Sequence, residues 1–235
     1  MTLDPPAISR RLLAEFVGTA FLVAAVVGSG IAASRLSPDD VGLQLLENAL
    51  ITGAALVALI LALQPVSAAF NPVVTMVERT LGLIGTRDAA MTVVAQVAGG
   101  TLGVVAANLM FDLDAVTIAT QQRSSPGLWL GEVVATLGLV IVIFGSLRSG
   151  RTETIAFAVG GYITAAYWFT SSTSFANPAV TVARMFSDTF AGIAPASVPA
   201  FIVMQLVGGA AGLLAVRALY PAPSIRDVTH EGAPA

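Results

Sequence analysis

The sequence predicts an all-α membrane protein in which six transmembrane helices and two re-entrant half-helices form an inverted repeat. Three observations support this fold: an apolar composition, six long apolar spans, and a short Asn-Pro motif that occurs twice. Of the 235 residues, 56% are hydrophobic and 11% are charged, and the mean hydropathy is +0.85. Because soluble domains carry about 25% charged residues, this composition predicts an integral membrane protein.

Six spans have the length of about 20 residues that a bilayer requires, and they carry almost no charge. They run approximately over Leu12–Ala33, Leu45–Val66, Ala89–Phe111, Leu128–Leu147, Ile155–Ser171 and Val198–Tyr220.

The motifs Asn71-Pro72-Val73 and Asn177-Pro178-Ala179 contain the only two Asn-Pro pairs of the chain. Asn caps helices and Pro is favoured in their first turn, so each motif predicts the start of a helix. Each helix would have about 10 residues, which is too short to cross a bilayer. A lone Asn-Pro pair would most simply start a helix, but two half-length helices at matching places in a membrane protein indicate a solute site near the midplane.

The spans also pair into an internal repeat. Residues 14–19 in the first span parallel residues 131–136 in the fourth, and residues 96–100 in the third parallel residues 205–209 in the sixth. Three spans per half is an odd number, so the second repeat must enter the membrane from the opposite side. The two half-helices should therefore dip in from opposite faces and meet near the centre.

The distribution of arginine predicts the orientation. With both termini inside, the cytoplasmic segments hold eight arginines, and the outside holds the other three, Arg35, Arg123 and Arg184. This excess satisfies the positive-inside rule. We therefore expect a channel domain at 12–220, with repeats at about 12–111 and 128–220, between a cytoplasmic N-terminus at 1–11 and a cytoplasmic tail at 221–235.

The chain resembles the aquaporins of the major intrinsic protein family over nearly its whole length. The paired Asn-Pro motifs, Glu15 and Glu132, the two Gln/Gly-Gly repeats and the string from Asn177 to Arg184 carry this resemblance. It implies an aquaporin-like fold and a homotetramer with one pore per subunit. The string from Trp168 to Asn177 is similar to that of a bacterial subgroup linked to metalloid efflux.

The chemistry of the two Asn-Pro motifs agrees with a pore that excludes protons and ions. In a capping Asn the side-chain oxygen accepts from its own helix, which leaves the amide nitrogen as a donor to the lumen. Asn71 and Asn177 would then offer two donors to one passing oxygen atom, and a water held this way cannot continue a proton wire. Two helix N-termini, each carrying about half a positive charge, also repel protons and cations.

The expected selectivity filter departs from the family pattern. Water-selective aquaporins usually have Arg directly after the second Asn-Pro-Ala, where this chain has Val180. The resemblance assigns Ser174 and Ala165 to two further filter positions. On the second span it assigns Thr52 if one residue is deleted before Asn71, and Ile51 without that gap. The filter Thr52, Ala165, Ser174 and Val180 is uncharged, which predicts a wider and less polar constriction.

Two further departures point the same way. Val73 replaces the usual alanine of the first motif, and Ala69 replaces a histidine that the family commonly has two residues before the first Asn. Loss of that histidine favours a permissive channel. Arg184 lies seven residues after Asn177, and we expect it to be structural, tying the half-helix to its surroundings.

Glu15 and Glu132 have two possible roles. An ionisable side chain inside a membrane span is by default a functional candidate, such as a proton relay. The resemblance instead makes each a buttress that accepts hydrogen bonds from the N–H groups of a re-entrant loop. We favour the buttress because irregular backbone at membrane depth must have its donors satisfied.

Together these features predict a passive channel for small uncharged solutes: glycerol-like polyols, neutral metalloid hydroxides such as arsenous acid, and water. The channel would lie in the plasma or inner membrane. There is no Cys, and the only His is His230 in the tail, so we expect no enzyme activity, cofactor or metal site. The net charge of −3, from arginine without lysine, gives no argument for a nucleic-acid partner. A mainly water-conducting channel, an ion-coupled transporter with broken helices and a non-conducting scaffold remain alternatives.

Overall fold

The computed structural model describes residues 6–220, and the helices account for most of them. The predicted tail with Arg226 and His230 lies outside the described residues, as do residues 1–5. Two helices are short, α3 (Pro72–Thr80) and α7 (Pro178–Ala183). The six long ones are α1 (Ile8–Leu36), α2 (Val41–Leu63), α4 (Thr86–Met110), α5 (Pro126–Arg148), α6 (Ile155–Phe169) and α8 (Val198–Leu219). Three 3₁₀ turns complete the helical segments: η1 (Thr152–Thr154), η2 (Arg184–Phe186) and η3 (Pro195–Ser197).

Each of the six long helices corresponds to one predicted span, so the predicted fold class is confirmed. Within residues 6–220, five helices are long and apolar enough to cross a membrane. The exception is α6, whose 15 residues rise only about 22 Å. The turn η1 precedes α6 directly and lengthens this crossing.

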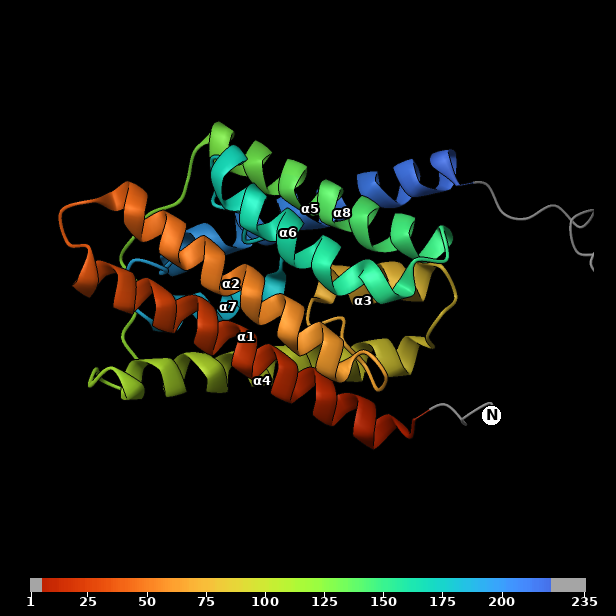
Figure 1. Ribbon diagram of the computed structural model, residues 1–235, viewed down its shortest axis with the longest axis horizontal. Coiled ribbons are helices and arrows are strands. Elements are labelled where there is room, and N and C mark those ends of the chain that lie inside the picture. Colours follow the sequence, from red (N-terminus) through yellow and green to blue (C-terminus); the bar gives the residue numbers. More distant parts are fainter. Residues whose placement is uncertain (1–5, 221–235) are drawn as a thin grey trace, which may run out of the picture.

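The two halves of the chain are arranged head to tail. Figure 1 shows α3 and α7 in opposite halves of the molecule, so the two half-helices enter from opposite ends. The first residues of α1 and the last residues of α8 lie at the same end of the bundle (Figure 1), as an even number of crossings requires.

Within each repeat, the first and last long helices pack closely, α1 on α4 and α5 on α8, while α2 packs on α6 across the repeats. Glycines allow this approach at equivalent places. A Cβ atom on Gly99 would overlap the carbonyl group of Phe16, and one on Gly208 would lie 2.5 Å from the carbonyl oxygen of Val133. These two glycines belong to the repeated Gln/Gly-Gly strings, and their lack of a side chain sets the distance between helices.

Candidate functional site

Each half-helix begins at the Asn of its motif. The Oδ1 atom of Asn71 accepts from the main-chain N–H of Val73 at 2.9 Å, and that of Asn177 accepts from the N–H groups of Ala179 and Val180 at 3.0 and 3.3 Å. Pro72 and Pro178 occupy the first helical positions, where a missing N–H costs nothing. The local sequence therefore determines where both half-helices start.

The two motifs are joined to each other through their side-chain amides. The Nδ2 atom of Asn71 donates to the carbonyl oxygen of Ala176 at 2.8 Å, and that of Asn177 donates to the carbonyl oxygen of Phe70 at 2.7 Å. Each amide has two hydrogens, so one N–H per Asn is left over. Both residues line the central cavity, toward which the remaining donors are available.

The residues that accept these bonds have an unusual backbone conformation. Phe70 has φ of 48° and Ala176 has φ of 47°, in the left-handed region that non-glycine residues rarely adopt. Each of them directly precedes the Asn of its motif. Such strain costs about 1–3 kcal/mol per residue, so the surrounding contacts must over-determine it.

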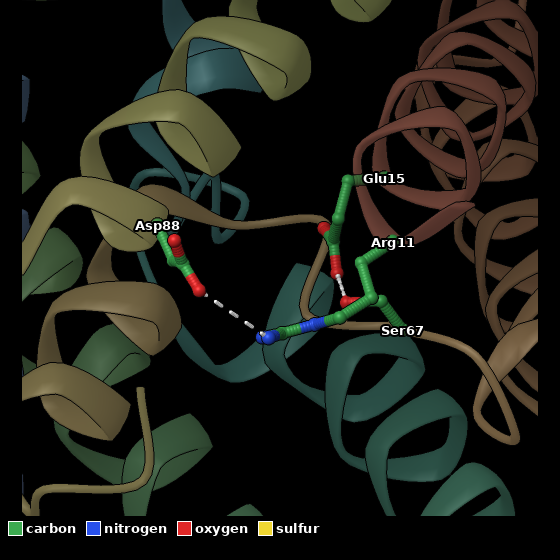
Figure 2. A network of polar contacts seen from close by, with 4 residues as sticks. All are labelled: Arg11, Glu15, Ser67 and Asp88. Atoms are coloured by element: carbon green, nitrogen blue, oxygen red, sulfur yellow. Dashed lines mark hydrogen bonds and ion pairs between the residues drawn. The ribbon is translucent and has the colours of Figure 1, made fainter. Parts of the chain in front are cut away.

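In the first half, those contacts come from Glu15 on α1. Its carboxylate accepts from the N–H groups of Ala69 and Phe70 at 2.8 and 2.7 Å, and from Ser67 Oγ at 2.5 Å. Figure 2 shows Glu15 against Ser67, with the Arg11–Asp88 ion pair beside them. The side chain of Glu15 is fully buried, and these donors are the ones that a buttress would satisfy.

Glu132 on α5 makes the equivalent contacts in the second half. Its carboxylate accepts from the N–H groups of Phe175 and Ala176 at 3.0 and 2.9 Å, and from Gln205 Nε2 at 2.6 Å. Like Glu15, it is completely buried. In both halves the carboxylate satisfies the donors of the strained residue before the Asn, so the loop is held from the helix side.

A cavity of about 560 Å³ runs along the bundle past both motifs. Its walls are rows of residues spaced four apart, which lie on one face of a helix. Thr52, Leu56 and Ile60 form the row on α2, while Val159, Ile163 and Tyr167 form the row on α6. Glu78 lines one end of the cavity and Arg184 the other.

Three of the four predicted filter residues line this cavity together. Thr52, Ser174 and Val180 are all buried, with exposed fractions of 3%, 3% and 5%. Ile51, the alternative on α2, is 50% exposed and does not line the cavity. The structure therefore selects Thr52 over Ile51 as the residue of α2 that faces the lumen.

The fourth assignment is corrected, because the structure does not bring Ala165 to the cavity. Ala165 is exposed on the outside of α6, whereas Tyr167, two residues later, is buried and lines the cavity. Two residues correspond to a rotation of about 200° around a helix, so both cannot face the lumen. The hydroxyl of Tyr167 lies 3.1 Å from that of Thr52. The row of residues spaced four apart could have revealed Tyr167 in the sequence.

The other departures from the family pattern occupy two different environments. Ala69 lines the cavity. Val73 and Ala179 are buried away from it, and the side chain of Val73 packs against Gly209 of α8. The extra bulk of Val73 is thus accommodated by a glycine and not by the lumen.

Comparison with known proteins agrees with this geometry. The family model described as Major intrinsic protein matches residues 3–170, well over half of the chain. The chain belongs to the major intrinsic protein family. This major intrinsic protein is 49% identical over 230 residues to Aquaglyceroporin AqpS of Rhizobium meliloti (strain 1021), a match that covers 97% of this chain and 98% of the relative. It is also 34% identical over 144 residues to Aquaporin C of Dictyostelium discoideum, which covers 58% of this chain and 52% of that protein.

Among solved structures, the aquaglyceroporin from Plasmodium falciparum matches with a TM-score of 0.69 over 95% of this chain and 100% of that chain. At 18% identity this match shows the fold alone. Membership of the major intrinsic protein family makes this protein a multi-pass membrane channel for small solutes and not an enzyme.

Proposed function

We propose that this major intrinsic protein is a passive channel for glycerol-like polyols, neutral metalloid hydroxides such as arsenous acid, and water, and that it excludes protons and ions. The observation that carries the proposal is the cavity wall formed by Thr52, Ser174 and Val180. These side chains are of small or medium size and uncharged, so they leave room for a solute larger than water. The near full-length relative at 49% identity is itself named an aquaglyceroporin.

In this proposal the two motifs exclude charge. The free N–H groups of Asn71 and Asn177 would orient a passing oxygen atom at the centre of the channel. The N-termini of α3 and α7 add their partial positive charges at the same place. Glu15 and Glu132 act as buttresses, since their lone pairs are already occupied by loop and glutamine donors.

The assembly and orientation belong to the same proposal. We expect a homotetramer with one pore per subunit in the inner membrane, and both termini in the cytoplasm. The excess of arginine on the side of the termini supports this orientation.

A series of permeability measurements on proteoliposomes tests the proposal. Purified protein is reconstituted into liposomes. Water permeability is followed by the shrinkage of the liposomes, and glycerol, urea and arsenous acid permeability by the uptake of each solute, with protein-free liposomes as the baseline. Glycerol and arsenous acid flux above baseline, unchanged by ionophores, is the expected result. Flux of water alone would indicate the water-conducting alternative, and flux that requires an ion gradient would indicate a coupled transporter.

A further inference from the structure

Arg184 lies at the end of the cavity that the half-helix α7 approaches. It follows α7 directly and is four residues beyond Val180, so the two side chains lie on one face of consecutive turns. Both line the cavity, and only 2% of the surface of Arg184 is exposed. The sequence alone suggests a structural role for this arginine, but its position is on the wall of the lumen.

The hydrogen bonds of Arg184 leave much of its guanidinium unused. Nε donates to the carbonyl oxygen of Ala191, and the group stacks on Phe175 with Cζ 3.5 Å from the ring centre. Within residues 6–220, neither Nη atom has a hydrogen-bond acceptor, and neither is among the polar atoms that are both buried and without a partner. Because Arg184 lines the cavity, N–H donors of its Nη atoms that lack a protein acceptor can bind a solute there over the small part of the side chain that is exposed.

Other polar side chains line the cavity together with Arg184. Ser174 lines the same cavity, but its hydroxyl oxygen is itself buried and has no hydrogen-bond partner among the described residues, so in this conformation it does not face a solute. Thr52 and Tyr167 also line the cavity, and their hydroxyls lie 3.1 Å apart. The end of the cavity near Arg184 therefore presents donors to a solute oxygen and hydroxyls to a solute hydrogen.

Among the residues that the structure describes, no carboxylate lies within ion-pair distance of the Arg184 guanidinium. The one ion pair within residues 6–220 joins Arg11 and Asp88, which lie at the other end of the channel. A second guanidinium, that of Arg123, lies 5.1 Å from the ring centre of the same Phe175. Burial lowers the pKa of Arg123 to about 10, which still leaves it protonated at neutral pH. Two cations thus share one ring beside the lumen.

We propose that Arg184 is a selectivity residue of this channel: its Nη groups bind an oxygen atom of the permeating neutral solute, and its charge turns away cations one helical turn beyond Val180. The inference rests on the proposed channel function. A solute with hydroxyl or carbonyl oxygens can accept from the planar fork of donors, whereas a hydrated cation meets only like charge.

Arg123 provides a matched control for the test. It is 8% exposed, stacks on the same ring and donates to the carbonyl oxygen of Gly192 at 2.9 Å, but it does not line the cavity. The variants Arg184→Met and Arg123→Met each remove one buried guanidinium, and only the first removes a charge from the lumen. Arg184→Lys keeps the charge without the fork, and Arg184→Gln keeps an amide donor without the charge.

The experiment measures sodium leak, glycerol flux and water flux in proteoliposomes of equal protein content. We expect Arg184→Met and Arg184→Gln to raise the sodium leak about tenfold, while Arg184→Lys and Arg123→Met keep the wild-type leak. We also expect Arg184→Met and Arg184→Lys to lower the ratio of glycerol to water flux about tenfold, since the bidentate donors are lost.

Two results would overturn the inference. One is an Arg184→Met channel whose sodium leak and ratio of glycerol to water flux match the wild type. The other is an Arg123→Met channel that changes the sodium leak and this ratio as much as Arg184→Met does. If Arg184→Met does not fold, Arg184→Gln and Arg184→Lys carry the same comparison of charge with donors. A wild type that conducts water but no glycerol would refute the proposed solutes, while the sodium leak would still test Arg184.

Discussion

The Nδ2 atom of Asn177 lies 2.7 Å from the carbonyl oxygen of Phe70, more than one hundred residues earlier in the chain. The mirror contact from Asn71 in the first half reaches the equivalent carbonyl of the second half. Each Asn therefore caps its own half-helix with its oxygen and holds the opposite loop with its nitrogen. One residue type serves both purposes because an amide carries an acceptor and donors on the same side chain.

Asn177→Asp should expose this double role. The carboxylate keeps the cap but has no hydrogen to donate, so it places negative charge against the carbonyl oxygen of Phe70. We expect a loss of stability of about 1–3 kcal/mol or more, seen as a lower unfolding temperature in detergent. Asn71→Asp should behave alike, because its contact is equivalent.

Ser125→Ala is the control for the capping part of this effect. Ser125 caps the N-terminus of α5 through its hydroxyl and holds no distant carbonyl, so its loss should cost only about 1 kcal/mol. An Asn177→Asp protein as stable as the wild type would show that the bond to Phe70 contributes nothing.

Glu132→Gln should separate a buttress from a proton relay. The amide can satisfy fewer of the donors of Phe175, Ala176 and Gln205, and it turns its own N–H groups toward some of them. We expect a destabilisation of about 3–5 kcal/mol, measured as loss of folded protein on size-exclusion chromatography. Glu153→Gln, on the exposed turn η1, is the control and should have no effect.

A relay would give a different result for the same variant. Glu132→Gln would then fold normally, and wild-type flux would respond to a pH gradient while the flux of the variant would not.

Val180→Arg tests the assignment of the constriction. The change adds a bulky cation to the cavity wall one turn from Arg184, so two like charges would lie at a spacing of four residues. Glycerol and arsenous acid flux should fall far more than water flux in proteoliposomes. Proton leak should stay negligible in both forms, because exclusion of protons depends mainly on Asn71, Asn177 and the half-helix dipoles.

Val180→Met is the control, since it adds length without charge. An equal loss of all solutes would mean that Val180→Arg only plugs or misfolds the channel, and unchanged selectivity would show that Val180 does not line the constriction.

Because the chain has no native cysteine, single-cysteine variants can map the lumen without background. A small uncharged thiol reagent should block flux through Thr52→Cys and Val180→Cys, whose positions line the cavity. The same reagent should leave flux through Ile51→Cys and Ala165→Cys unchanged, since both positions are exposed on the outside of the bundle. If the reagent blocked flux through Ala165→Cys but not through Thr52→Cys, Ala165 and not Thr52 would line the lumen.

Sequence alone is enough to predict the number of crossings, the two half-helices and their inverted arrangement. These features depend on local physics, because the length of an apolar run shows whether it can cross the bilayer, and an Asn-Pro pair fixes where a helix begins. Glu15 and Glu132 could also be singled out from the sequence, because a carboxylate inside a membrane span needs hydrogen-bond partners wherever it lies.

Helix packing, by contrast, sets which face of each helix meets the lumen and which residues contact each other across the repeats. The family resemblance places Ala165 in the filter, but a shift of two residues turns a side chain about 200° around the helix axis, and the packing of α6 on α2 places Tyr167 inside instead. The left-handed conformations of Phe70 and Ala176 arise from bonds to carboxylates and amides that are distant in sequence. The position of Arg184 on the cavity wall likewise depends on Phe175 and Ala191, because a long flexible side chain takes its direction from the partners that surround it and not from its neighbours in the chain.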